Sequence, residues 1–116
     1  MASMFNFKDK YGLEYQNNVV YKINCPDCVS FYVGETNRRL IDRFNEHLMR
    51  SFGGQKGILF HHCTELGHAL PDFHNDCLVI GREPQWYKRK IRESLLIKES
   101  KPSLNRNVVS YSLELF

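Results

Sequence analysis

The residues between Val19 and His47 combine types that a hydrophobic core alone does not require. Two short hydrophobic runs carry Tyr21 and Tyr32, and a polar segment with Arg43 and His47 follows them. Tyrosine and histidine can move protons, and arginine can hold a phosphate through two parallel hydrogen bonds. Such a set suits the cleavage of a phosphodiester bond. The alternative is that both tyrosines are half-buried strand aromatics, which occur in many sheets.

One face of an expected helix would carry a basic stripe. It consists of Arg43, His47 and Arg50, whose spacing places them on the same side of a helix. The planar guanidinium groups on this face could bind phosphate. The alternative is a solvated basic face, in which Arg43 pairs with Glu46 or Glu35.

Glu93 is a third candidate, and it follows a run of basic residues late in the chain. Its simplest interpretation is a surface ion pair with Arg89 or Lys90. Glu93 also shares a helical face with Ile97 and Trp86, so its carboxylate could point partly inward and bind Mg²⁺ together with phosphate oxygens. Basic and aromatic side chains near Trp86 would suit a strand of nucleic acid. The side chains expected to contact DNA are Arg38, Arg39, Arg50, Lys88 and Arg89.

Cys25 and Cys28 enclose a Pro-Asp turn with the spacing of a zinc knuckle. His62 and His68 are separated by five residues, which suits the second half of a tetrahedral zinc site. We therefore expect a structural Zn²⁺ with these four ligands. Such an ion would connect the turn between two strands to a later helix.

The remaining cysteines, Cys63 and Cys77, bring the total to four. Four cysteines could form two disulfides in a secreted protein, but Met1 to Lys10 contains no apolar signal segment. We therefore expect reduced thiols and an intracellular, reducing compartment. Cys63 could replace His62 at zinc, and His61 is less suited. The alternative is that the cysteines are buried free thiols.

Length and charge bound the class of protein. A chain of 116 residues is enough for one domain with one core. The formal net charge of +3 permits nucleic-acid binding without indicating it. No apolar run is long enough to span a bilayer, so we expect no membrane partner.

The hydrophobic pattern predicts a small α/β or α+β domain, with a three-stranded mixed or antiparallel sheet flanked by helices. The expected strands are 19–24, 30–34 and 78–80. The expected helices are 37–50, with Thr36 or Asn37 as N-cap, then 58–66 ended by Gly67, and 84–100 with Pro84 in its first turn. Residues 51–57 read as a loop. Residues 1–17 would be an extension and 108–116 a tail, in which Val108 and Val109 could add an edge segment.

Several motifs in order resemble those of the GIY-YIG nuclease superfamily. Val19-Val20-Tyr21 and Tyr32-Val33-Gly34 resemble its paired motifs, with ten residues between the tyrosines. Arg43 and His47 stand where its first helix has an arginine and then a histidine. Glu93 resembles its metal-binding glutamate, and Asn105 its late asparagine. The resemblance covers residues 19–107 and departs at Val19-Val20, which replaces Gly-Ile.

The resemblance implies a role for each of the first four residues. Tyr21 would be the general base or relay that activates the nucleophile, and His47 would support or accept from it. Tyr32 would position the nucleophile or contact the phosphate, and Arg43 would stabilise the charge on that phosphate. Because a free tyrosine has a pKa of about 10, Arg43, His47 or a metal would have to favour the phenolate.

The resemblance also implies roles for Glu93 and Asn105, which lie late in the sequence. Glu93 would hold one divalent ion, Mg²⁺ or Mn²⁺, which stabilises the leaving oxygen. Asn105 would complete the site residues by fixing the end of the last helix.

The cysteine pair between the tyrosine motifs and the later Gly67-His68 resemble one subgroup, the endonuclease domain of Penelope-like retroelements. This resemblance implies a nuclear DNA nickase that supplies the primer for target-primed reverse transcription. Its partners would be DNA and a reverse transcriptase domain N-terminal to this chain. The alternatives are a zinc-containing nucleic-acid-binding module without cleavage, and a homing or structure-specific repair nuclease.

Overall fold

The computed structural model describes residues 12–49, 51–52 and 55–105. Its strands are β1 (Val19–Asn24), β2 (Phe31–Thr36), β3 (Ser51–Phe52), β4 (Gln55–Lys56) and β5 (Cys77–Arg82). Its helices are the 3-10 turn η2 (Leu13–Tyr15) and α2 (Leu40–His47), α3 (Ile58–Leu66), α4 (Phe73–Asp76) and α5 (Trp86–Ser100). The expected segment at Val108 and Val109 lies outside the described residues.

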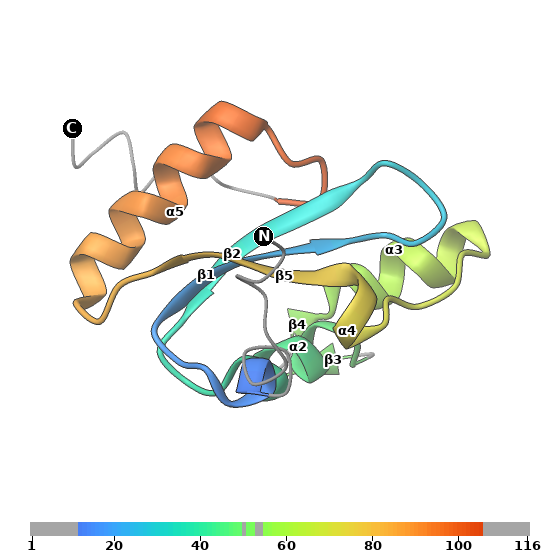
Figure 1. The fold of residues 1–116 in the computed structure, drawn as a ribbon. Coiled ribbons are helices and arrows are strands. Elements are labelled where there is room, and N and C mark those ends of the chain that lie inside the picture. Colours follow the sequence, from blue (N-terminus) through green and yellow to red (C-terminus); the bar gives the residue numbers. More distant parts are fainter. Residues whose placement is uncertain (1–11, 50, 53–54, 106–116) are drawn as a thin grey trace, which may run out of the picture.

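The sheet is three-stranded and antiparallel, with the order β2-β1-β5 (Figure 1). β1 is its central strand, and Val19, Val20 and Tyr21 in it are fully buried. A strand that is covered on both faces reads as a continuous hydrophobic run, which explains why β1 lacks polar alternation. The predicted α+β class and the three predicted strands are confirmed, and the sheet is antiparallel rather than mixed.

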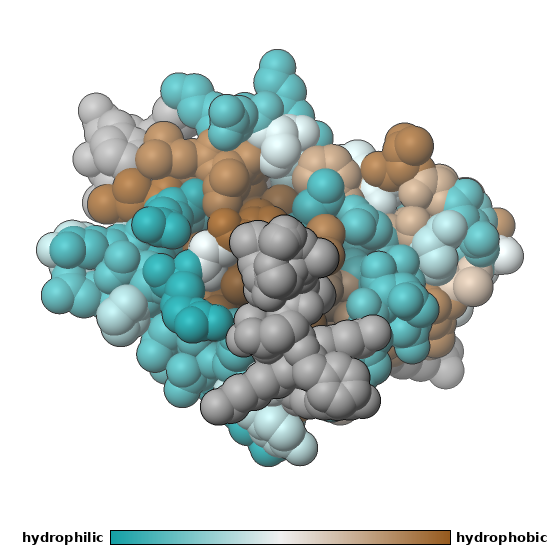
Figure 2. Space-filling view, viewed as in Figure 1, coloured by the Kyte–Doolittle hydropathy of each residue, from teal (hydrophilic) through white to brown (hydrophobic). Residues whose placement is uncertain are grey.

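Helices cover both faces of the sheet (Figure 1). α5 packs on β2 and β1 from one side, while α2, α3 and α4 lie on the other side. The core between the sheet and these three helices contains Val19, Tyr21, Ile23, Leu40, Phe44, Leu59, Phe73 and Cys77. Apolar side chains also remain on the outer surface along α5 (Figure 2), where Leu95 is 53% exposed. One helix therefore faces the three others across the sheet.

The helix that carries Arg43 and His47 begins later than expected. Residues 37–50 were the predicted span, whereas α2 runs from Leu40 to His47. The Thr36 hydroxyl accepts a hydrogen bond from the Arg38 amide at 3.0 Å. This bond closes a local turn at the end of β2, a conformation that competes with helix formation. The prediction of Thr36 or Asn37 as N-cap is therefore wrong.

Three other boundaries differ from the predictions. The expected loop 51–57 contains the short antiparallel pair β3 and β4. The four-residue helix α4 was not predicted, and its N-cap Asp72 accepts a hydrogen bond from the Asn75 amide. α5 begins at Trp86 with Gln85 as N-cap, two residues after Pro84. The prediction of α3 over 58–66, with Gly67 at its end, is confirmed.

Candidate functional site

The centre of the candidate active site is a buried hydrogen bond between β1 and α2. The Tyr21 hydroxyl lies 2.7 Å from His47 Nε2, and both side chains are buried. Burial, and then the neighbouring Arg43 charge, lower the pKa of His47 to about 3, so its imidazole is neutral. Burial also raises the pKa of Tyr21 well above its usual value of 10. Tyr21 is therefore a neutral phenol hydrogen-bonded to a neutral His47, and this environment does not favour the phenolate.

Tyr32 stands beside this pair on β2. Its ring lies 4.5 Å from the His47 ring and 6.3 Å from the Tyr21 ring, measured between centroids. Gly34 leaves room for this packing, because a Cβ atom there would lie 2.6 Å from the Tyr21 hydroxyl oxygen and 2.8 Å from the Tyr32 ring. Burial raises the pKa of Tyr32 above its usual value. The structure thus brings both tyrosines and His47 together.

Arg43 lies one helical turn before His47 on α2, and it is only partly exposed. Arg43 Nη1 is 3.0 Å from Glu46 Oε1, so the ion pair considered from the sequence is present. Burial raises the pKa of both tyrosines, and the positive charge of Arg43 partly opposes this effect. Arg43 therefore sits between Glu46 and the tyrosine pair.

Glu93 reaches the same group from α5 on the other side of the sheet. Its side chain is 17% exposed, and Lys90 Nζ lies 3.9 Å from Glu93 Oε1. Burial raises the pKa of Glu93 to about 7, with Lys90 opposing the shift and Glu35 adding to it. Arg43 is close enough to act on it as well. A half-buried carboxylate could also coordinate a divalent metal ion, which would favour its ionised form.

The basic residues predicted as DNA contacts divide into exposed and buried. Lys88 is exposed, as are Arg38 and Arg39, although Arg38 pairs with Glu46 at 2.6 Å and Arg39 with Asp42 at 2.9 Å. Arg50 lies outside the described residues.

Arg89 differs from these residues because it is only 2% exposed. Its guanidinium donates to Glu35 Oε1 at 2.6 Å, to Asn18 Oδ1 at 3.0 Å and to the Glu83 carbonyl at 3.0 Å. Its burial and these internal bonds argue against Arg89 as a DNA contact. Arg89 instead connects the start of α5 to β1 and β2.

Asn105 does not fix the end of α5, which ends at Ser100 with Lys101 as a C-cap in the left-handed region. Its amide side chain bonds the backbone of Val33, accepting from the amide at 2.9 Å and donating to the carbonyl at 2.7 Å. Val33 follows Tyr32 on β2. Asn105 therefore has a structural role at the outer edge of β2, beside the tyrosine pair, instead of at the end of the last helix.

Four metal-binding side chains meet at the other end of the β1–β2 hairpin. Ligand atoms of Cys25, Cys28, His62 and His68 all lie within 4.8 Å of one another. Cys25 Sγ is 3.3 Å from His68 Nδ1, and Cys28 Sγ is 3.3 Å from His62 Nε2. A tetrahedral zinc ion separates its sulfur and nitrogen ligands by about 3.5 Å. The four residues could therefore hold a metal ion such as zinc.

The local structure brings His68 back to the hairpin. Gly67 has a φ of 71°, and the His68 amide bonds the Cys63 carbonyl at 2.7 Å, which reverses the chain after α3. Asp27 then accepts a hydrogen bond from the Ala69 amide at 2.7 Å. These bonds hold His68 beside the Cys25–Cys28 turn.

The thiols differ in their surroundings. All four cysteines lie within the described residues and are free. Hydrogen bonds from Ser30, followed by that of His62, lower the pKa of Cys28 to about 6, which favours a metal-binding thiolate. Burial raises the pKa of Cys63 and of Cys77 to about 12. Cys63 belongs to the core beside Cys25, so the geometry favours His62 as the ligand.

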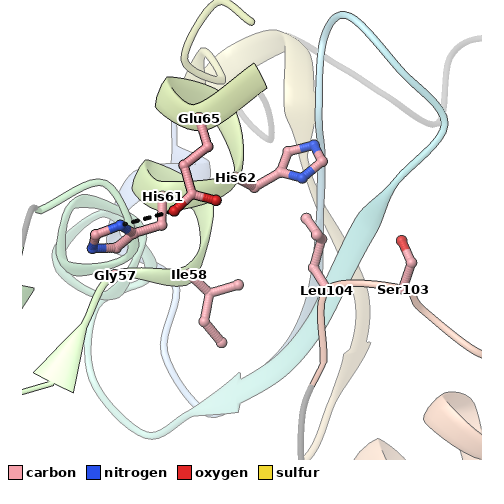
Figure 3. A pocket seen from close by; sticks show the side chains of 7 residues that line it. All are labelled: Gly57, Ile58, His61, His62, Glu65, Ser103 and Leu104. Atoms are coloured by element: carbon pink, nitrogen blue, oxygen red, sulfur yellow. Dashed lines mark ion pairs between the residues drawn. The ribbon is translucent and has the colours of Figure 1, made fainter. Parts of the chain in front are cut away.

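A pocket of about 310 Å³ lies beside this cluster, between α3 and residues 103–104 (Figure 3). Its lining residues are Gly57, Ile58, His61, His62, Glu65, Ser103 and Leu104. His61 points away from His62 and toward Glu65, with its Nδ1 4.0 Å from the carboxylate (Figure 3). This orientation confirms that His61 is not among the four clustered ligands.

The buried His47 should make the protein sensitive to acid. In the folded state its pKa is about 3, whereas an unfolded histidine titrates near 6.5. The unfolded chain therefore binds an extra proton below pH 6.5, and stability falls by up to about 1.4 kcal/mol for each pH unit down to pH 3. His47→Gln keeps an acceptor for Tyr21 but does not titrate. We expect chemical denaturation to show that this variant loses about 2 kcal/mol less than the wild type between pH 7 and 5; equal losses would contradict the assignment.

The Lys90–Glu93 ion pair considered from the sequence is present. The pairing of Glu35 with Arg89 and Lys90 was not anticipated, because it depends on contacts between β2 and α5. Comparison with family models, curated proteins and solved structures gave no significant match.

None of the helices in the described ranges is long and apolar enough to cross a membrane.

Proposed function

We propose that this protein is a divalent-metal-dependent DNA endonuclease of the GIY-YIG type, which hydrolyses one phosphodiester bond and leaves a nick. The observation that carries this proposal is the buried hydrogen bond of 2.7 Å between Tyr21 and His47. Arg43, Tyr32 and Glu93 surround that pair from three further positions. A proton relay, a cation and a carboxylate are the groups that hydrolysis of a phosphodiester requires.

The proton relay runs from the nucleophile through Tyr21 to His47. As the oxygen of a water molecule attacks phosphorus, its proton passes to the Tyr21 oxygen and the Tyr21 proton passes to His47 Nε2. Because Arg43 disfavours a charged His47, the negative phosphate must offset that charge when DNA is bound. Tyr21 thus acts as a relay rather than as a preformed phenolate.

Charge on the phosphate is balanced from both sides of the sheet. Arg43 stabilises the phosphate oxygens as negative charge grows. Glu93 would hold Mg²⁺ or Mn²⁺, and a bound ion supplies Lewis-acid stabilisation of the leaving oxygen. The half-buried Glu93 would be the residue that holds this ion.

The Cys25, Cys28, His62 and His68 cluster is proposed to bind one structural Zn²⁺. Four protein ligands leave no open coordination position, which is the arrangement of structural zinc sites. The ion would tie the β1–β2 turn to the end of α3. Through β1 and β2 it would also support the strands that carry Tyr21 and Tyr32.

The biological context is proposed from the same residues. A cysteine pair between the two tyrosines, completed by two later histidines, supports the resemblance to Penelope-like retroelements. In that context a reverse transcriptase domain lies N-terminal to this chain, and the nick supplies its primer in the nucleus. The sequence that precedes this chain in the full-length protein tests this part of the proposal directly.

Incubation with supercoiled plasmid tests the activity. We expect conversion to the open circle with Mg²⁺ or Mn²⁺ and none with EDTA. The second candidate, a zinc-containing module that binds nucleic acid without cleaving it, rests on the metal cluster and the exposed basic residues. Retardation of DNA in a gel without nicking at any metal concentration would favour that candidate.

A further inference from the structure

A chain of charged side chains crosses from α5 to β2 beside Glu93. Arg89 Nε lies 2.6 Å from Glu35 Oε1, and Lys90 Nζ lies 2.9 Å from Glu35 Oε2. Lys90 Nζ also lies 3.9 Å from Glu93 Oε1. One carboxylate, Glu35, is therefore shared by two cations, of which only Lys90 also reaches the candidate active site.

Glu35 holds Lys90 next to Glu93, where its ammonium could contact a substrate phosphate. Arg89 and Lys90 bond different oxygens of the Glu35 carboxylate, so both cations are fixed by it. Lys90 is 24% exposed, compared with 2% for Arg89, and it is near enough to Tyr32 to act on its ionisation.

We propose that Lys90 is a further catalytic residue, which contacts a phosphate oxygen of the DNA next to Glu93, and that Glu35 is the residue that positions it. This inference rests on the proposed function. Arg43 would stabilise the phosphate from the α2 side and Lys90 from the α5 side. Two cations on opposite sides suit a phosphate whose charge spreads over several oxygens.

Lys90→Met tests the proposal, because it keeps the aliphatic stem and removes the charge. We expect the single-turnover nicking rate at saturating DNA to fall by roughly 10²-fold. Mn²⁺ binding, followed by electron paramagnetic resonance, should be retained, because a nearby positive charge opposes metal binding. Lys98→Met is the matched control on the exposed part of α5, and we expect its rate to stay within twofold of the wild type.

Two further variants and one binding measurement keep the inference separable from the proposed function. We expect Lys90→Arg to recover part of the rate and Glu35→Gln to lower it less than Lys90→Met. If the wild type does not nick, the salt dependence of DNA binding tests whether Lys90 contacts a phosphate. Lys90→Met should lower the slope of log affinity against log salt concentration by about one, and Lys98→Met should leave that slope unchanged. A Lys90→Met protein with wild-type rate, or one that has lost Mn²⁺ binding, would overturn the proposal. In a chain that does not nick, an unchanged slope would overturn it as well.

Discussion

Cys28→Ala should abolish stoichiometric zinc binding and remove most of the stability of the domain. A structural zinc site contributes on the order of 10 kcal/mol of apparent binding free energy, which becomes folding free energy when the site exists only in the folded chain. The cluster joins two distant segments of the chain. Cys28 and His62 are 34 residues apart in the sequence, and Cys25 and His68 are 43 residues apart. The same segments are also joined by the hydrogen bond that Asp27 accepts from the Ala69 amide. Elemental analysis of protein purified without added zinc, together with thermal denaturation, measures both effects.

Cys63→Ala is the matched control for the zinc prediction. Cys63 is buried beside Cys25 but lies outside the four-residue cluster. We expect this variant to keep one zinc ion per chain, with a loss of about 1 kcal/mol from the missing sulfur atom. Purified wild-type protein with only a small fraction of an equivalent of zinc would refute the site, and zinc loss in Cys63→Ala would show that the ligand set is wrong.

The second large effect is expected at the two groups that balance charge on the phosphate. Arg43→Ala should lower the nicking rate by roughly 10³-fold, because removing one preformed donor to a charged transition state costs about 10²- to 10³-fold or more. Glu93→Gln should cause a similar loss and abolish Mn²⁺ binding, because it removes the carboxylate charge at nearly constant shape. Rates on supercoiled plasmid at saturating metal measure both losses.

Arg39→Ala is the control for charge at this end of the protein. Arg39 is exposed at the start of α2, where it pairs with Asp42. We expect it to raise the DNA concentration needed for half-maximal rate and to leave the maximal rate within a few fold. A Glu93→Gln protein that nicks at the wild-type rate would remove Glu93 from the metal site.

The sequence was sufficient for the features that depend on local pattern. β1 was recognisable because its run of Val19, Val20 and Tyr21 is buried on both sides. α3 was placed correctly because Gly67 provides the left-handed residue that ends it. The cysteine and histidine spacings identified the four residues that the structure brings together.

The features that sequence reasoning missed depend on contacts between distant elements. A run of basic residues in α5 reads as a surface, yet Arg89 is buried because Glu35 and Asn18 accept its hydrogen bonds. The start of α2 was misplaced because the Thr36 hydroxyl bonds the Arg38 amide instead of capping a helix. Asn105 was assigned to the end of α5, although its partner is the backbone of Val33, 72 residues earlier.

The cleavage rate of Tyr21→Phe tests the central claim most directly. This substitution removes one hydroxyl group and keeps the buried ring, so the core, the zinc cluster and the Glu93 carboxylate should be unaffected. We expect single-turnover nicking to fall by at least about 10²-fold, the typical contribution of a positioned proton-transfer group, while DNA affinity, Mn²⁺ binding and zinc content stay at wild-type values. A Tyr21→Phe protein that nicks DNA at the wild-type rate would contradict the assignment of the Tyr21–His47 pair as the proton relay of a nuclease.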